Sequence, residues 1–227
     1  MEIKRSKKKQ EKKQEQGADP VLEGIIKAKE YATENSNRLI AVVAVVVLVI
    51  GGIYGYSHIK KQNLRAAQEA FGSAMIHYNA QDTAKAIDAL ALVAENHSGS
   101  PQAGYAAYLL GDMHLADAKY DQAITWLEVA TKRENAGLVS GEALELLAVA
   151  HEAKGDVKKA EQYYRRALED RSISYRYPAI RWKLALLLFR NGIPDEAKQY
   201  CEQLVQDTTA GEYRQKAENL LAENQLL

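Results

Sequence analysis

A repeat of 37 residues runs from about residue 66 toward the end of the chain, and it limits the fold more than any other feature. Small side chains recur at this spacing, and large apolar side chains keep a constant offset from them. The repeating positions hold Ala86, Ala123, Ala160 and Ala197; Ala74, Gly111, Ala148, Ala185 and Ala222; Leu110, Leu147, Leu184 and Leu221; Val93, Ala130, Ala167 and Leu204; and Trp126, Tyr163 and Tyr200. Periods of about 20 to 50 residues are typical of chains that stack one supersecondary unit on the next.

The small residues predict where helices cross. Two antiparallel helices approach closely only where small side chains face each other, and large apolar side chains must fill the remaining space. Turn signals at Gly155, at residues 191–194 and at residues 99–101 separate the helices. We therefore predict an all-α solenoid of four helix hairpins over residues 66–206. Residues 211–227 then form the first helix of a fifth repeat, which serves as a C-terminal cap.

A second feature is an apolar segment of 21 residues without Asp, Glu, Lys or Arg, between Arg38 and Lys60. A helix of this length rises about 30 Å, the thickness of a hydrocarbon core. We predict a transmembrane helix at residues 39–59, a basic tail with a short amphipathic helix at residues 1–38, and a repeat domain at residues 60–227. A cleaved signal peptide is the alternative, with small residues at Gly55 and Ser57 near a cleavage site.

The orientation of this segment follows from a lysine-rich cluster at residues 4–13. Positively charged flanks stay in the cytoplasm, and long C-terminal domains are translocated largely regardless of their own charge. We expect a bacterial inner-membrane protein with a cytoplasmic N-terminus and a periplasmic repeat domain, in contact with lipid through its helix. Gly51 and Gly55 form a small-xxx-small pair that either packs against a second membrane helix or is simply tolerated in a lone span.

The repeat residues resemble the tetratricopeptide repeat, which places Leu-Gly or Leu-Ala in its first helix and two alanines with an aromatic residue in its second. The matching residues are Leu110, Gly111, Tyr120, Ala123 and Ala130, followed by Leu147, Ala148, Gly155, Ala160, Tyr164 and Ala167. The unit departs from that pattern, because it is longer than about 34 residues and has histidine where tyrosine is usual. The first repeat also has Ser73 where leucine is expected.

The order of the parts is similar to that of the YfgM-like ancillary subunits of the SecYEG translocon. The similarity covers a lead with residues 31–35, a single apolar span, residues 52–56, and an alanine-rich helix that leads into repeats. This resemblance implies a periplasmic repeat domain held beside the translocation channel. Its partners would be translocon subunits, exported chains and chaperones.

In such a solenoid the first helix of each repeat lines a concave groove. The residues expected along it are Phe71, Met75, Tyr78, Tyr105, Tyr108, Asp112, Glu142, Glu145, Glu152, Trp182, Leu186 and Phe189. Aromatic ends then flank an acidic middle, which would take an extended or helical peptide and select basic or polar partners. The alternative is that the aromatic side chains pack on each other or under the C-terminal helix.

Other chemistries find little support. His77, His114 and His151 share the repeat spacing, but equivalent residues of stacked helices lie about 10 Å apart, too far to share one zinc ion. No nucleophile elbow or phosphate loop is present, so we predict no enzyme, no cofactor and no metal. Residues from Lys60 onward carry 20 Lys and Arg against 23 Asp and Glu, which disfavours nucleic acid.

These features predict a membrane-tethered protein-interaction adaptor, associated with the export translocon and binding exported chains or periplasmic chaperones through the groove. The alternative is a self-associating cell-envelope scaffold that binds no client. The sequence leaves a homo-oligomer open.

Overall fold

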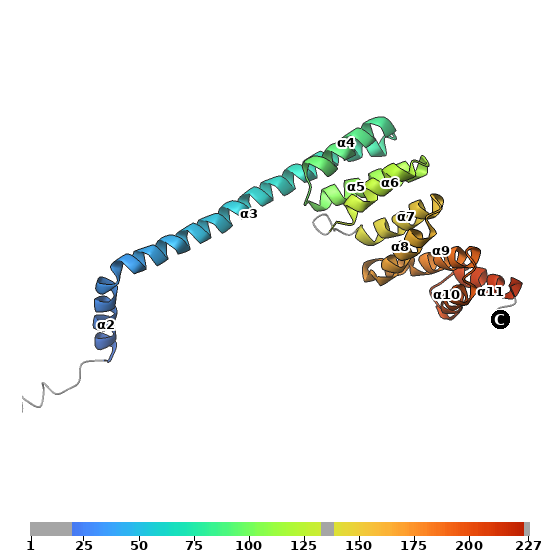
Figure 1. The fold of residues 1–227 in the computed structure, drawn as a ribbon. Helices are drawn as coiled ribbons and strands as arrows, with labels where there is room; N and C mark the ends of the chain where they lie inside the picture. The colour runs from blue at the N-terminus through green and yellow to red at the C-terminus, as the bar shows by residue number, and fades with distance from the viewer. Residues whose placement is uncertain (1–19, 133–138, 225–227) are drawn as a thin grey trace, which may run out of the picture. The chain divides into compact units, whose positions relative to one another are not determined.

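The structure, a computed structural model, describes residues 20–132 and 139–224. Every regular element in these ranges is helical, which confirms the all-α prediction. The elements are α2 (Pro20–Glu34), α3 (Ser36–Asn79), α4 (Thr83–Asn96), α5 (Pro101–Ala116), α6 (Tyr120–Ala130), α7 (Ser140–Ala153), α8 (Val157–Glu169), the 3-10 helix η1 (Arg171–Arg176), α9 (Tyr177–Arg190), α10 (Pro194–Gln206) and α11 (Glu212–Glu223) (Figure 1). The chain divides into two compact units, Met1–Lys60 and Lys61–Leu227. The lysine-rich cluster lies outside the described residues.

The second unit is a stack of helix pairs in chain order (Figure 1). The end of α3 lies beside α4 (Figure 1), and Ala74 of α3 shares one core cluster with Leu90 and Val93 of α4. The following pairs are α5 with α6, α7 with α8, and α9 with α10. The second helices of the pairs begin at Thr83, Tyr120, Val157 and Pro194, so the predicted spacing of 37 residues is kept. Helix α11 follows as the predicted cap.

The turn inside each pair has three residues, and its middle residue has a positive φ. These residues are Gln81, Ala118, Gly155 and Gly192, with φ of 59°, 56°, 78° and 75°. A left-handed residue after a helix lets the next amide groups bond back to the last carbonyls, and glycine adopts it without strain. The amide nitrogens of Asp82 and Asp156, for example, donate to the carbonyl oxygens of His77 and His151 at 3.1 and 2.9 Å.

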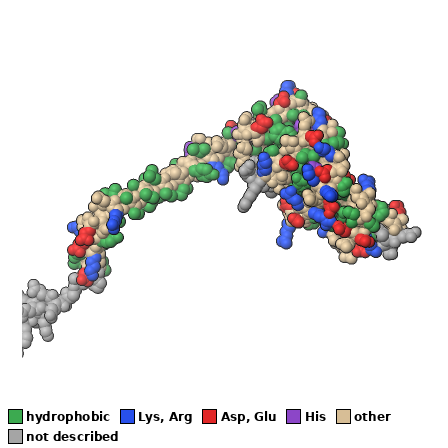
Figure 2. Space-filling view, viewed as in Figure 1, with side chains coloured by type: hydrophobic (Ala, Val, Ile, Leu, Met, Phe, Trp, Pro, Cys, Tyr) green, Lys and Arg blue, Asp and Glu red, His purple; other side chains and the backbone are tan. Residues whose placement is uncertain are grey.

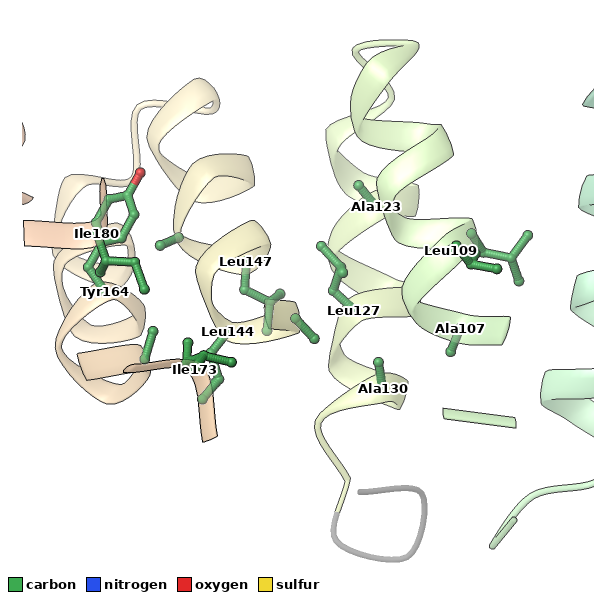
Figure 3. Packing of buried hydrophobic residues seen from close by; sticks show 14 of the residues in the cluster. Ala107, Leu109, Ala123, Leu127, Ala130, Leu144, Leu147, Tyr164, Ile173 and Ile180 are labelled. Atoms are coloured by element: carbon green, nitrogen blue, oxygen red, sulfur yellow. The ribbon is translucent and has the colours of Figure 1, made fainter. Parts of the chain in front are cut away.

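The core lies between successive helices, where the small repeating residues are buried (Figure 3). Gly111 shows the reason: a Cβ atom added there would lie 2.6 Å from Cδ2 of Leu127 on α6. Leu110, Leu147 and Leu184 are likewise fully buried, and Leu221 carries the same column into α11. Ala222, the last member of its column, is exposed, and no helix follows α11 in the described part of the chain.

The linkers between pairs are less regular than the turns within them. Between α8 and α9 the chain forms η1, which the sequence pattern did not predict. Its Ile173 is fully buried and lies against Gly141, where an added Cβ would lie 2.8 Å from Cγ2 of Ile173. This contact anchors η1 beside the start of α7, and the neighbouring side chains of η1 reach α7 as well.

In the first unit, α2 and the start of α3 are separated by Asn35, whose Nδ2 donates to the carbonyl oxygen of Tyr31 at 3.1 Å. Helix α2 is the predicted amphipathic helix, and its Val21, Leu22, Ile25 and Ile26 are exposed. The apolar segment of residues 39–59 lies within α3, and its side chains are also exposed, as the apolar cover of α3 in Figure 2 shows. Within the described residues, α3 is the one helix long and apolar enough to cross a membrane.

Candidate interaction surface

An aromatic row lies at the start of the predicted groove. The rings of Phe71 on α3 and Tyr105 on α5 meet edge to face, with centroids 5.5 Å apart. Tyr105 in turn meets Tyr108, one turn further along α5, at 6.0 Å. Edge-to-face and offset contacts of this kind stabilise aromatic pairs. Tyr105 remains 40% exposed, so the row keeps an open ring on the surface.

The other apolar side chains predicted for the groove are half-buried. Met75, Tyr78 and Phe189 pack against the main core, and Leu186 is also half-buried. Trp182 packs beside a smaller C-terminal cluster that includes Tyr213 and Leu220 of α11. Trp182 therefore packs against the same cluster as side chains of the cap, whereas Tyr105 is partly open.

The acidic middle of the groove is largely paired, and Glu145 is its most buried member. Its side chain is 1% exposed and forms ion pairs with Arg176 of η1 and with Lys183 of α9, the latter at 2.7 Å. Burial alone would raise the pKa of Glu145, but the hydrogen bonds from Arg176 and Lys183 outweigh it and hold that pKa below its ordinary value. Glu145 therefore ties α7 to the next repeat and is not free to bind a partner.

Glu152 is engaged in a similar way. Its Oε2 accepts a hydrogen bond from the hydroxyl of Tyr164 at 2.9 Å, and its Oε1 lies 3.9 Å from Nη1 of Arg190. The hydroxyl of Tyr164 is thereby satisfied although the side chain is fully buried. Like Glu145, Glu152 holds neighbouring helices together.

Glu142 and Asp112 differ from these two glutamates. Glu142 Oε1 accepts a hydrogen bond from the hydroxyl of Tyr175 at 2.8 Å, whereas its Oε2 is buried and has no hydrogen-bond partner among the described residues. Burial is the main cause that raises the pKa of Tyr108 to about 12. The negative charges of Asp112 and Glu142 raise this pKa further, whereas the positive charge of Arg176 lowers it. Asp112 and Glu142 thus both lie within electrostatic range of Tyr108, the last ring of the aromatic row.

Tyr175, Arg176 and Lys183 were not predicted as part of the surface. Arg176 and Lys183 lie 31 and 38 residues after Glu145, which is close to the repeat length. A search for basic residues about one repeat after each glutamate could therefore have found them. Tyr175, which is 70% exposed, could not be predicted in this way, because it belongs to η1, a linker that does not follow the repeat pattern.

Two of the three repeating histidines are buried, and His77 is half-buried. His114 and His151 are buried at the ends of α5 and α7, and His151 stacks on Tyr163 with ring centroids 5.3 Å apart. No group of three or more His, Cys, Asp or Glu side chains in the described part of the chain could hold a metal ion. Cys201 is also buried, and burial raises the pKa of its thiol to about 11, so it is a poor nucleophile.

Gly51 and Gly55 have open surroundings. An added Cβ at either position would meet nothing within 4 Å. The surface of α3 around them is therefore free in a single chain.

Three repeat-family models match the chain in succession. A tetratricopeptide repeat-like domain matches residues 29–140, and two tetratricopeptide-repeat models match residues 130–175 and 180–207. The chain is a tetratricopeptide-repeat protein. Tetratricopeptide repeats are typical of protein-interaction modules, so the repeats of this chain indicate protein partners.

Solved structures share the repeat fold. A crystal structure of nearly identical TPR-like repeats from Podosopora anserina is 18% identical, with a TM-score of 0.52 over 70% of this chain and 93% of its own. A double mutant of MamA RS-1 is 16% identical, with a TM-score of 0.50 over 80% of this chain and 96% of its own. Comparison with curated protein sequences gave no match. At these identities the likeness concerns the fold alone.

Proposed function

We propose that this tetratricopeptide-repeat protein is a membrane-tethered interaction adaptor of the protein-export translocon. Residues 39–59 span a bacterial inner membrane, residues 1–38 lie in the cytoplasm, and the repeat domain from residue 60 onward lies in the periplasm. There it binds translocon subunits, exported chains or chaperones through the first helices of its repeats. Tethering raises the local concentration of this surface for any chain that emerges beside it.

The observation that carries this proposal is the contrast between two apolar surfaces. The apolar side chains of residues 39–59 are exposed along α3, and such a surface is stable only when lipid covers it. The repeats bury a continuous apolar core, and Tyr105 is among the large side chains that stay exposed, beside Tyr108 and its neighbouring carboxylates. Exposed aromatic anchors with polar neighbours are typical of peptide-binding surfaces.

Site-specific photo-cross-linking in native membranes tests the proposal. A photoreactive residue at Tyr105 or at Trp182 should capture translocon subunits, exported chains or chaperones. The same residue at Lys158, exposed on α8, is the matched control and should capture far less. Equal capture from all three positions, or none from Tyr105 and Trp182, would contradict the adaptor function.

A self-associating envelope scaffold is the second candidate, supported by the open surroundings of Gly51 and Gly55. Two such helices would approach closely through these glycines. Detergent-stable homo-oligomers that are lost in Gly51→Leu and Gly55→Leu variants would favour the scaffold. A monomer, or an oligomer unchanged by both substitutions, would favour the adaptor.

A further inference from the structure

The four predicted carboxylates of the groove fall into two classes. Glu145 and Glu152 are each engaged by side chains from other helices or from η1. Among the described residues Asp112 forms no ion pair, and Glu142 is bonded through one oxygen, to the neutral hydroxyl of Tyr175.

The charges of this region can be summed. Asp112, Glu142 and Glu145 give three negative charges, whereas Arg176 and Lys183 give two positive charges, so one negative charge is left over. Both cations form their ion pairs with Glu145, and Arg176 also lies within electrostatic range of Tyr108, whereas Asp112 and Glu142 have no ion-pair partner among the described residues.

The aromatic row lies beside this surplus. Tyr108 connects the two features, because it contacts Tyr105 and lies within electrostatic range of both Asp112 and Glu142. A tyrosine ring attracts a cation over its face, and a carboxylate forms charge-assisted hydrogen bonds with it. Ring carbons next to the carboxylates also offer apolar area to a long side chain. Together, Phe71, Tyr105, Tyr108, Asp112 and Glu142 form what we call the aromatic–carboxylate surface.

We propose that the aromatic–carboxylate surface binds a lysine or arginine side chain together with an adjacent apolar side chain in an extended segment of a partner protein. The apolar side chain packs on Tyr105 and Phe71. The cation lies at Tyr108, within electrostatic range of the carboxylates of Asp112 and Glu142. This inference rests on the proposed function and specifies the chemistry of the partner.

An acidic partner segment fits less well. The cations nearest to the surface, Arg176 and Lys183, already form ion pairs with Glu145, and an acidic ligand would have to break these pairs or lie against Asp112 and Glu142. Like charges placed together across an interface are strongly unfavourable. Basic segments are therefore selected by repulsion of acidic ones as well as by attraction.

Selection from a random displayed 12-residue peptide library on the full chain in lipid nanodiscs tests the inference. The wild-type chain should enrich peptides with Lys or Arg next to a large apolar residue at least about tenfold, one factor of ten being 1.4 kcal/mol. The Asp112→Asn/Glu142→Gln variant should lose the enrichment of basic residues and still enrich apolar ones. Gln at position 142 keeps an oxygen to accept from Tyr175, so folding should be preserved, and the thermal melt of the variant checks this.

Glu95→Gln, at an exposed position of α4, is the matched control and should keep the basic preference. Peptides that bind without any preference for Lys or Arg would overturn this inference while leaving the proposed adaptor in place. Failure of the wild-type chain to enrich any peptide would overturn both. Loss of the basic preference in Glu95→Gln as well would also overturn it, because the effect would then be one of overall charge.

Discussion

The two units of the chain treat apolar side chains in opposite ways. In Lys61–Leu227 the repeating leucines and alanines are buried between helices, whereas the valines and leucines of residues 39–50 are exposed along α3. The same helix contributes to both units, since α3 supplies the apolar segment and the first helix of the first repeat. Both units are rich in apolar residues, but these residues are spaced differently along the chain. Apolar residues at repeat spacing pack between the helices, whereas the uninterrupted apolar segment is long and apolar enough to cross a membrane.

The largest expected effect is on membrane insertion, and it differs between two exposed positions on α3. Val46→Lys places a charge at the middle of the apolar segment, at a cost of about 2.5 to 3.5 kcal/mol for insertion into a bilayer. Ile76→Lys, in the second unit, is the control, because Ile76 is exposed to water and lysine is tolerated there. Alkaline extraction of membranes should release much more of the Val46→Lys chain. Equal release of both variants would show that the apolar segment is not in lipid.

A smaller effect, on the free energy of unfolding, is expected when two glycines of the second unit are replaced by alanine. Gly111→Ala should lower the free energy of unfolding by about 2 kcal/mol, since Leu127 must move to accept the new methyl group. Gly72→Ala meets nothing within 4 Å and should instead raise it by about 0.5 to 1 kcal/mol through helix propensity. Urea unfolding followed by circular dichroism measures both. A neutral Gly111→Ala would mean that α5 and α6 are farther apart than described.

The turns allow a sharper comparison between the early and the late repeats. Ala118 has a φ of 56°, in a region that glycine adopts without strain, and Ala118→Gly should stabilise the fold by about 1 kcal/mol. Gly155→Ala, at the equivalent turn of the next repeat, should destabilise it by a similar amount. Melting temperatures of the two variants should therefore move in opposite directions. A shift of the same sign in both would contradict a shared turn geometry.

The smallest expected effect concerns the buried histidines. Burial, followed by the nearby cations Lys119 and Lys159, lowers the pKa of His114 and of His151 below the ordinary value of 6.5. The unfolded chain then binds protons that the folded chain does not, so stability is full above about pH 6.5 and declines as the pH falls below it. The loss between pH 7.5 and 5.5 should be about 1 kcal/mol or less per histidine.

Urea unfolding at both pH values checks this dependence. His151→Gln should reduce it, whereas His97→Gln, away from the repeating position, should not. The carboxylates with lowered pKa values, such as Asp82 and Asp117, act only at lower pH and do not confuse the comparison. A pH dependence unchanged in His151→Gln would show that this histidine is not a titrating group of the core.

Most of the fold follows from the sequence because small residues at helix crossings leave a strict pattern. Gly111 and Ala148 must be small wherever the neighbouring helix approaches, so their spacing reports the stacking directly. The continuity of α3 was less visible, since a residue such as Lys60 at the end of an apolar segment does not end a helix. The 3-10 helix η1 was not visible at all, because it belongs to a linker whose length varies between repeats.

The candidate surface was predicted in part. The aromatic residues Phe71, Tyr105 and Tyr108, all expected along the groove, contact one another in a row. The charge of the surface was misjudged for Glu145, which the structure buries with two cations, because pairing across repeats depends on the position of η1. A sequence pattern gives the face of a helix on which a carboxylate lies, but not which side chain of the next repeat reaches it.

Flotation of the full chain with lipid vesicles after alkaline washing is the most direct measurement of the central claim. The account predicts that the full chain floats with the vesicles, that protease then removes the repeats, and that a lipid-protected fragment containing residues 39–59 remains. A chain that stays in the aqueous fraction, or one without a protected fragment at these residues, would contradict it.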